Sequence, residues 1–382
     1  MKRFVAMGLL VVILMGLIPL RAKAADLEVA AKSAILIDLA TGTVLYEQNS
    51  HTPLAPASVT KVMTMLLIME AIDDGRIGWQ DTVTASENAA AKGGSQIFLK
   101  VGETMSVEDM VKSIAVSSAN DCACAMAEHI YGSEAAFVEV MNKRAAELGM
   151  KDTHFVNCTG LDDEPEAENH KTSAHDIAIM SRELLKNHPD IKKYTTIWMD
   201  TVRNGAFGLS NTNKLVRFYQ GATGLKTGFT SGAGYCLSAS AMRDGMELVA
   251  VVMGSETSAK RFAGCKTMLD YGFANYATVT PEMPGVMTVP VILGTEEQVV
   301  AVPGNQDALL IDKSQRSQIH TKIQLDPQVT APVSQGQRLG TLHILSGEQV
   351  IAQIPLLAEK PVAKRTFGQL FVEMLGALAM AK

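Results

Sequence analysis

The chain has 382 residues, of which 47% are hydrophobic and 19% are charged, and its formal net charge is −6. This length allows two domains with a sizeable core, and the acidic balance gives no reason to expect a nucleic-acid partner. The sequence contains no phosphate-binding loop, dinucleotide-binding glycine pattern or His-x-x-x-His pair, so we expect neither a cofactor nor a metal.

Residues 1–24 are organised like a secretory signal peptide. Lys2-Arg3 is followed by an apolar run over 4–20 and then by Ala22-Lys23-Ala24, the small-x-small pattern of a cleavage site. The apolar run is slightly long, so an uncleaved membrane anchor is the alternative. Pro19 lies near the end of the run and favours cleavage. The sequence therefore predicts an exported protein.

Residues 25–275 mix the patterns of helices and strands. Strands are expected near 33–47 and 233–254, and the helices expected between them lie near 58–73, 106–117, 120–130, 134–148 and 173–187. Strands at both ends of a region with helices in the middle favour one antiparallel sheet with helices packed on it. The sequence therefore predicts an α+β fold for this region.

A hydroxyl and an amine lie three residues apart at the start of the first helix, in Ser58-Val59-Thr60-Lys61. A serine becomes a good nucleophile when an adjacent base takes its proton. A lysine can be that base only when neutral, and burial or a second cation lowers its pKa from ~10.4. The residues after Lys61 are apolar almost all round the helix, which predicts burial. Taken alone, the string is more often an ordinary helix cap.

Two further strings supply polar groups of the kind an acyl-transfer site needs. Ser118-Ala119-Asn120 adds a second hydroxyl for proton relay and an amide that can hold a substrate carbonyl. Lys226-Thr227-Gly228 offers a cation and a hydroxyl to a carboxylate, and Gly228 allows a substrate backbone to approach closely. Alone, these are a capping turn and a strand with a solvated lysine. In this order, the three strings resemble the signature of penicillin-binding proteins and β-lactamases, with Ser-Ala-Asn where the β-lactamase pattern has Ser-Asp-Asn.

After residue 24 the chain resembles the low-molecular-mass penicillin-binding proteins, specifically the serine-type D-alanyl-D-alanine carboxypeptidases. Further stretches similar to that family are Ala34-Ile35-Leu36-Ile37-Asp38, Leu54-Ala55-Pro56-Ala57, Gly160-Leu161-Asp162, Ser173-Ala174-His175-Asp176 and Tyr271-Gly272-Phe273. The resemblance implies a penicillin-binding/β-lactamase-like fold. It also implies removal of the terminal D-alanine from peptidoglycan stem pentapeptides, with β-lactam antibiotics as covalent inhibitors.

The resemblance also implies a role for each motif residue. Ser58 would attack the penultimate D-alanine carbonyl, Lys61 would act as general base, and Ser118 would relay the proton to the departing D-alanine. Asn120 would position the substrate amide.

On the opposite wall, Lys226 and Thr227 would face the terminal carboxylate, with Lys226 also helping to keep Lys61 neutral. The backbone N–H groups of Ser58 and Phe229 would form the oxyanion hole. Arg261 or Lys260 is a looser candidate for extra positive charge.

Related chemistries remain as alternatives. A β-lactamase needs a deacylating carboxylate, and the chain has no Glu-x-x-Leu-Asn string. Glu164, Glu166 and Glu168 cluster in a polar stretch that we interpret as a solvated acidic loop. The small residue Ala119 in the middle motif favours a carboxypeptidase, but the motifs do not separate it from a peptidoglycan endopeptidase or transpeptidase. An intact set of motif residues argues against an idle scaffold.

The five cysteines are an odd number for an exported chain. They are Cys122, Cys124, Cys158, Cys236 and Cys265. Our default expectation is buried free thiols that serve as small apolar residues. A single disulfide is the alternative, and the spacing does not assign it.

Short apolar alternations separated by turn residues predict a small all-β domain over 276–358. This domain carries none of the three motifs, so we expect it to act as a spacer or a docking module.

In the tail, 359–382, apolar residues recur at helical spacing, at Phe367, Leu370, Phe371, Met374, Leu375 and Leu378. The chain here is too short, and too interrupted by Glu373, to span a bilayer. Basic residues at 360, 364 and 365 suit anionic lipid headgroups. We expect an amphipathic helix that anchors the enzyme at the outer face of the cytoplasmic membrane. A helix packed on the β domain, or one that binds a partner, is the alternative.

Overall fold

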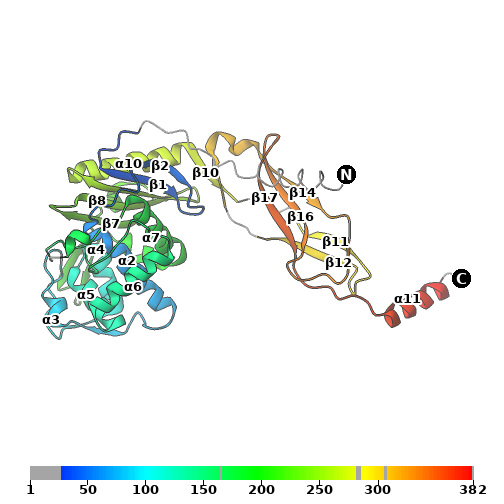
Figure 1. Ribbon diagram of the computed structural model, residues 1–382, viewed down its shortest axis with the longest axis horizontal. Helices are drawn as coiled ribbons and strands as arrows, with labels where there is room; N and C mark the ends of the chain where they lie inside the picture. The colour runs from blue at the N-terminus through cyan, green and yellow to red at the C-terminus, as the bar shows by residue number, and fades with distance from the viewer. Residues whose placement is uncertain (1–26, 164–165, 281–284, 305–307, 381–382) are drawn as a thin grey trace, which may run out of the picture. The chain divides into compact units, whose positions relative to one another are not determined.

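The computed structural model describes residues 27–163, 166–280, 285–304 and 308–380 (Figure 1). The predicted signal peptide lies outside these residues. By its contacts the chain forms two compact units, and each is described by itself. The first unit contains the chain up to Met242 together with Glu247–Gly272. The second unit contains Arg243–Met246 and the chain from Phe273 onward.

The first unit is built on a five-stranded sheet with strand order β2-β1-β9-β8-β7. These strands are β1 (Ser33–Asp38), β2 (Val44–Gln48), β7 (Ala222–Thr230), β8 (Gly234–Arg243) and β9 (Met246–Ser255). β1 pairs antiparallel with both β2 and β9, and β7 pairs antiparallel with β8. The two ends of the predicted region therefore meet in one sheet. β1 and β9 are buried at every position, which agrees with the apolar residues over 34–37 and 248–253 in their middle parts.

Helices cover both faces of this sheet. Figure 1 shows α10 (Ser258–Asn275) along one face and a helical layer on the other. That layer contains α2 (Lys61–Asp73), α4 (Val107–Ser117), α5 (Asn120–Tyr131), α6 (Glu134–Glu147) and α7 (Ala174–Asn187). α2 packs against α4, α5, α6 and α7, so its all-round apolar surface is buried as predicted.

Several short elements of the first unit were not predicted from the sequence pattern. They are α3 (Glu87–Ala90), α8 (Lys192–Thr195), α9 (Leu215–Phe218) and two hairpins, β3 (Thr82–Thr84) with β4 (Thr104–Ser106) and β5 (Met199–Val202) with β6 (Phe207–Ser210). Each has four residues or fewer, so its length is too small to show a helical or strand period.

The second unit is mainly β-structure. Its six-stranded sheet has the order β14-β16-β17-β12-β11-β15. The strands are β11 (Met287–Ile292), β12 (Gln298–Pro303), β14 (Ile319–Leu325), β15 (Val329–Thr330), β16 (Arg338–Ser346) and β17 (Gln349–Ala358). A separate pair joins β10 (Tyr276–Val279) to β13 (Leu309–Asp312). The core of this unit includes Val289, Leu342, Ile344 and Leu356. The α+β domain is thus followed by a small β domain, as predicted.

The chain ends in α11 (Phe367–Met380). Thr366 and Gln369 form a reciprocal cap at its start: the Thr366 N–H donates to Gln369 Oε1 at 2.8 Å, and the Gln369 N–H donates to Thr366 Oγ1 at 3.4 Å. Phe367 is 84% exposed and Val372 is 69% exposed. Within the described part of the chain, no helix has both the length and the apolar character to cross a membrane.

Candidate active site

Ser58 lies on a tight turn that leads into α2. The turn is a 3-10 helix over Ala57–Thr60, and Ala57 has a φ of 48°. A Cβ on Gly160 would lie 1.9 Å from the Ala57 carbonyl oxygen. Only glycine therefore fits beside this turn, which gives a structural reason for the Gly160-Leu161-Asp162 string.

His170 supports the same turn from behind. The Thr60 hydroxyl donates to the Ala57 carbonyl at 2.8 Å, and His170 Nε2 lies 2.8 Å from that hydroxyl. The Val156 N–H donates to His170 Nδ1 at 3.1 Å, so the neutral ring carries its proton on Nε2. Burial, followed by the charges of His154, Lys171 and Lys61, lowers the pKa of His170 to about 4. These contacts give His170 a structural role beside the serine turn.

Lys61 is held directly against the Ser58 hydroxyl. Its Nζ donates to Ser58 Oγ at 2.9 Å and to the Thr159 carbonyl at 2.8 Å. The side chain is fully buried. Burial lowers the pKa of Lys61 to about 7, although Cys158 and Asp121 act in the opposite direction. A large fraction of this amine is therefore neutral near pH 7 and can accept a proton from the serine.

Ser118 and Asn120 occupy the junction between α4 and α5. Ser118 has a φ of 63°, which turns the chain sharply at the end of α4. Asn120 is the first residue of α5, and its Nδ2 donates to the Gly93 carbonyl at 2.7 Å. Ser118 Oγ and Asn120 Oδ1 are buried and have no hydrogen-bond partner among the described residues. Such groups are destabilising unless something else binds them, so both are suited to contact a substrate.

Lys226 and Thr227 lie on β7. The Lys226 side chain is buried, and its Nζ donates to the Thr227 carbonyl at 2.8 Å. The Thr227 hydroxyl donates to Thr212 Oγ1 at 2.7 Å. Burial lowers the pKa of Lys226 well below its usual value, and the charges of Lys61 and Arg261 lower it further. The charge of Lys61 therefore disfavours the protonated form of Lys226.

Gly228 lies close to the serine turn. A Cβ at this position would lie 2.7 Å from the Pro56 carbonyl oxygen and 3.0 Å from the Val59 nitrogen. The glycine therefore allows β7 to pack against the serine turn of the protein itself. The next residue, Phe229, is 53% exposed, and its ring lies 4.3 Å from that of Tyr235 between centroids.

The two looser candidates for positive charge differ in their surroundings. Arg261 is buried, and its Nη1 donates to the Gly228 carbonyl at 3.0 Å and to the Cys236 carbonyl at 3.2 Å. It thus connects β7 to β8. Lys260 is exposed and forms an ion pair with Glu256.

The structure brings the three motifs to one place. β7 packs against the serine turn. Thr212 connects β7 to the end of α4, because its hydroxyl accepts a hydrogen bond from Thr227 and its N–H donates to the Val116 carbonyl at 3.2 Å. Sequence reasoning missed the Thr159 and Gly93 carbonyls and the Thr212 hydroxyl. The carbonyls are backbone groups that every residue carries, so no sequence signal marks them.

The acidic loop and the cysteines also agree with the sequence interpretation where the structure describes them. Glu166 and Glu168 are exposed, and Glu164 lies outside the described residues. All five cysteines are free and buried. Because Glu166 and Glu168 are exposed, they are poor candidates for a deacylating base held at the serine.

Family models match both units of the chain. A model described as D-alanyl-D-alanine carboxypeptidase matches residues 20–257, and one described as penicillin-binding protein 5, C-terminal domain, matches residues 282–364. The fold and the serine–lysine site thus define a penicillin-binding protein of low molecular mass. The chain belongs to the D-alanyl-D-alanine carboxypeptidase family.

Individual relatives resemble the chain over most of its length. The D-alanyl-D-alanine carboxypeptidase DacF of Bacillus subtilis (strain 168) is 44% identical over 351 residues, which cover 90% of this chain and 89% of the relative. DacC of Escherichia coli (strain K12), which has the same enzyme name, is 34% identical over 353 residues and covers 89% and 86% of the two chains.

Solved structures agree with these relatives. Penicillin binding protein 5 from Haemophilus influenzae has a TM-score of 0.76 at 31% identity and covers 89% of this chain and 100% of that one. A cefotaxime-bound form of penicillin-binding protein D2 from Listeria monocytogenes has a TM-score of 0.60 at 32% identity and covers 65% and 99%. The family and the α+β fold that the sequence predicted are therefore confirmed.

We expect Gly160→Ala to destabilise the first unit strongly, because the added Cβ would collide with the Ala57 carbonyl. Urea unfolding should show a loss of at least ~3 kcal/mol. Gly75→Ala is the matched control, since Gly75 has a similar φ of 71° but no atom within 4 Å of an added Cβ. It should lose only about 1 kcal/mol. Equal losses in the two variants would contradict a steric requirement at Gly160.

The rate of Ser58 acylation should depend on pH through Lys61. Only the neutral amine accepts the serine proton, and the pKa is about 7. The second-order rate constant with a labelled penicillin should rise about tenfold per pH unit well below this value. It should level off above it. A rate that stays constant between about pH 5 and pH 9 would show that Lys61 is not the titrating base.

Proposed function

We propose that this serine-type D-alanyl-D-alanine carboxypeptidase releases the terminal D-alanine of peptidoglycan stem pentapeptides through an acyl-enzyme on Ser58. The observation that supports this best is the buried Lys61 amine, 2.9 Å from the Ser58 hydroxyl and with a pKa of about 7. This pair supplies a nucleophile and its base in hydrogen-bond contact, which is the arrangement that covalent catalysis by serine requires.

In the acylation step, Ser58 Oγ forms a bond to the penultimate D-alanine carbonyl carbon while Lys61 takes the hydroxyl proton. The N–H groups of Ser58 and Phe229 would stabilise the oxyanion that develops. The peptide bond then breaks, and the leaving amine of the terminal D-alanine receives the proton through the Ser118 hydroxyl. Water hydrolyses the ester and restores Ser58.

Substrate contacts are assigned to polar groups of the three motifs. The Asn120 amide would hold the substrate amide through Oδ1, which has no partner among the described residues. Lys226 and Thr227 would face the terminal carboxylate of the stem. A β-lactam would enter the same reaction because its amide carbonyl acylates Ser58, but its leaving amine stays covalently attached. This attachment favours a longer-lived adduct.

The endopeptidase alternative has weaker support. A D-alanyl-D-alanine endopeptidase of Pseudomonas aeruginosa is 32% identical, but the match covers only 55% of this chain. The carboxypeptidase DacF matches 90% of the chain. The extent of similarity, together with the match of the C-terminal domain model, therefore favours the carboxypeptidase.

We also propose that the enzyme acts outside the cytoplasmic membrane and that α11 lies in the membrane interface. Peptidoglycan is built on that side of the membrane. Apolar side chains on α11, including Phe367 and Val372, are exposed, and Lys360 and Lys364 are exposed just before the helix. In a lipid surface, the apolar side chains would contact the acyl chains and the lysines would contact anionic headgroups.

Ser58→Ala should abolish covalent labelling by penicillin and lower the release of D-alanine by at least ~10⁴-fold. Intact mass measures the adduct, and free D-alanine can be measured enzymatically with a synthetic pentapeptide. Ser117→Ala is the control: it removes the hydroxyl of the residue before Ser118, which has no proposed role in the reaction, and this variant should be labelled normally. A Ser58→Ala protein that still forms the adduct would show that another residue is the nucleophile.

Deleting residues 366–382 should release the enzyme from anionic vesicles and leave penicillin labelling intact. The deletion starts at 366 because Lys364 and Val362 form bridges with Gly294 and Val333 of the β domain. Val350→Glu is the control, since this apolar residue is 43% exposed on β17 outside the helix. Vesicle co-sedimentation measures both variants, and full binding after the deletion would place the anchor elsewhere.

A further inference from the structure

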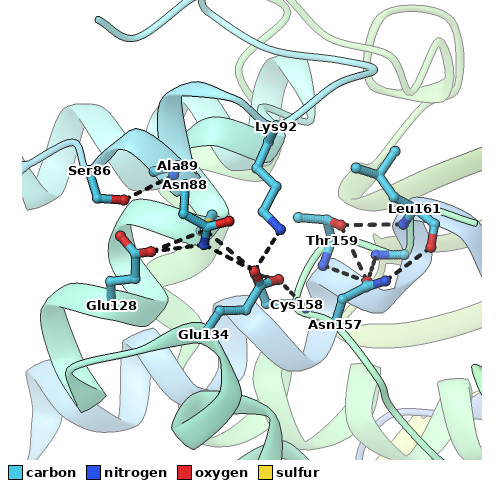
Figure 2. A network of polar contacts seen from close by, with 12 residues as sticks. Ser86, Asn88, Ala89, Lys92, Glu128, Glu134, Asn157, Cys158, Thr159 and Leu161 are labelled. Carbon is cyan, nitrogen blue, oxygen red and sulfur yellow. Dashed lines mark hydrogen bonds and ion pairs between the residues drawn. The ribbon is translucent and has the colours of Figure 1, made fainter. Parts of the chain in front are cut away.

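Glu134 begins α6 and is the common hydrogen-bond acceptor of three separate segments (Figure 2). Lys92 Nζ forms an ion pair with Oε2 at 2.7 Å. The Cys158 N–H and thiol donate to Oε1 at 3.3 Å and 3.2 Å. The Cys124 thiol donates to Oε2 at 3.6 Å from α5. Both members of the ion pair are largely buried, with 11% of the Lys92 side chain and 14% of the Glu134 side chain exposed.

Cys158 connects this carboxylate to the general base. The next residue, Thr159, provides the carbonyl that accepts a hydrogen bond from Lys61 Nζ at 2.8 Å. The Cys158 carbonyl in turn accepts one from the Thr64 hydroxyl at 2.6 Å. Glu134 therefore holds one side of the Cys158–Thr159 segment, and α2 holds the other.

Lys92 connects the same carboxylate to the substrate-binding amide. The next residue, Gly93, provides the carbonyl that accepts a hydrogen bond from Asn120 Nδ2 at 2.7 Å. A Cβ on Gly94 would lie 2.9 Å from the same Asn120 nitrogen, so this loop touches the amide closely. Asn120 is the first residue of α5, whose Cys124 also reaches Glu134.

The residues around Glu134 favour the charged form of its carboxylate. Burial on its own raises the pKa of Glu134, but the hydrogen bonds and charge of Lys92 and the contacts of Cys158 outweigh burial and lower it. The pKa of the Cys158 thiol is raised well above its usual value by Cys124, burial and Glu134. Glu134 is thus an anion near neutral pH, and the thiol keeps its proton and donates it.

The surrounding polar groups complete the cluster. Asn88 Nδ2 donates to Glu128 Oε1 at 2.9 Å, to Cys124 Sγ at 3.1 Å and to Glu134 Oε2 at 3.5 Å. The Glu134 carboxylate is therefore held by one cation, one amide, one backbone N–H and two thiols.

We propose that Glu134 is a positioning residue for acyl transfer, whose ion pair with Lys92 fixes the Gly93 and Thr159 carbonyls and, through them, the Asn120 amide and the Lys61 amine. The proposal rests on the assignment of Ser58 and Lys61 as nucleophile and base. A displacement of about 1 Å in a catalytic group can slow a reaction by ~100-fold, so a residue that touches no substrate can still control the rate.

The first experiment compares Glu134→Gln with the unchanged protein in the pre-steady-state reaction with a labelled penicillin. We expect the first-order acylation step to slow by ~10-fold to ~100-fold per labelled site. The dissociation constant of the non-covalent complex should change less than the acylation rate, by about 3-fold at most, because Glu134 touches no substrate and would affect binding only through the orientation of Asn120. If the ion pair only stabilised the fold, the variant would contain less folded protein and a smaller fraction would be labelled, but the folded molecules would be acylated at the unchanged rate.

Lys92 provides a second, independent test. Lys92→Met removes the ion pair and should slow acylation, whereas Lys92→Arg keeps a cation and should restore the rate to within ~3-fold of the unchanged protein. If Glu134→Gln does not fold, the Lys92 pair of variants carries the test alone. Glu70→Gln is the matched control, because Glu70 also forms a partly buried ion pair, at 2.8 Å from Arg144, and it should acylate normally.

Glu134→Gln and Lys92→Met proteins that acylate at the unchanged rate would overturn the proposal. Equal slowing by Glu70→Gln would overturn it as well, since any lost ion pair would then have the same effect. Failure of the proposed function has a different signature, because the unchanged protein would then form no Ser58 adduct.

Discussion

The burial of one amine imposes the main constraint on this structure. Lys61 is the first residue of the apolar helix α2. Its amine has two hydrogen-bond acceptors, Ser58 Oγ and the Thr159 carbonyl. A charged ammonium in such surroundings is unfavourable by several kcal/mol, which is why the pKa decreases towards neutrality. The base that we propose for catalysis is thus a consequence of core packing. The segment that carries Thr159 must stay in place for that base to be oriented.

Close approach of several backbone segments makes this arrangement possible. Gly160 and Gly228 lie against the serine turn from two sides, and neither position has room for a Cβ. The left-handed backbone conformation of Ser118 is a further departure from the most stable local structure. So are Ser118 Oγ and Asn120 Oδ1, which are buried without a hydrogen-bond partner among the described residues. Stability lost at such positions is typical of functional sites, where the missing partner is the substrate.

The second unit and α11 follow a simpler rule. Alternating apolar residues form strands around a core that includes Leu342 and Ile344, and none of the proposed catalytic groups lies there. Several apolar residues of α11 are exposed, namely Phe367, Phe371, Val372, Met374 and Leu375. The catalytic groups that we propose therefore belong to the first unit, and the proposed membrane contact belongs to the end of the second.

The sheet formed by the two ends of the region, the buried α2 and the motif residues could be predicted from the sequence, because apolar periodicity and side-chain chemistry are local properties of the chain. The fold was needed to show which backbone carbonyls hold Lys61 and Asn120, why Gly228 is a glycine, and that Glu134 joins three segments. These facts depend on contacts between residues far apart in the chain, and backbone groups are alike at every position. Short elements such as α3 also depend on tertiary contacts, because four residues are too few to show the apolar repeat of a helix or a strand.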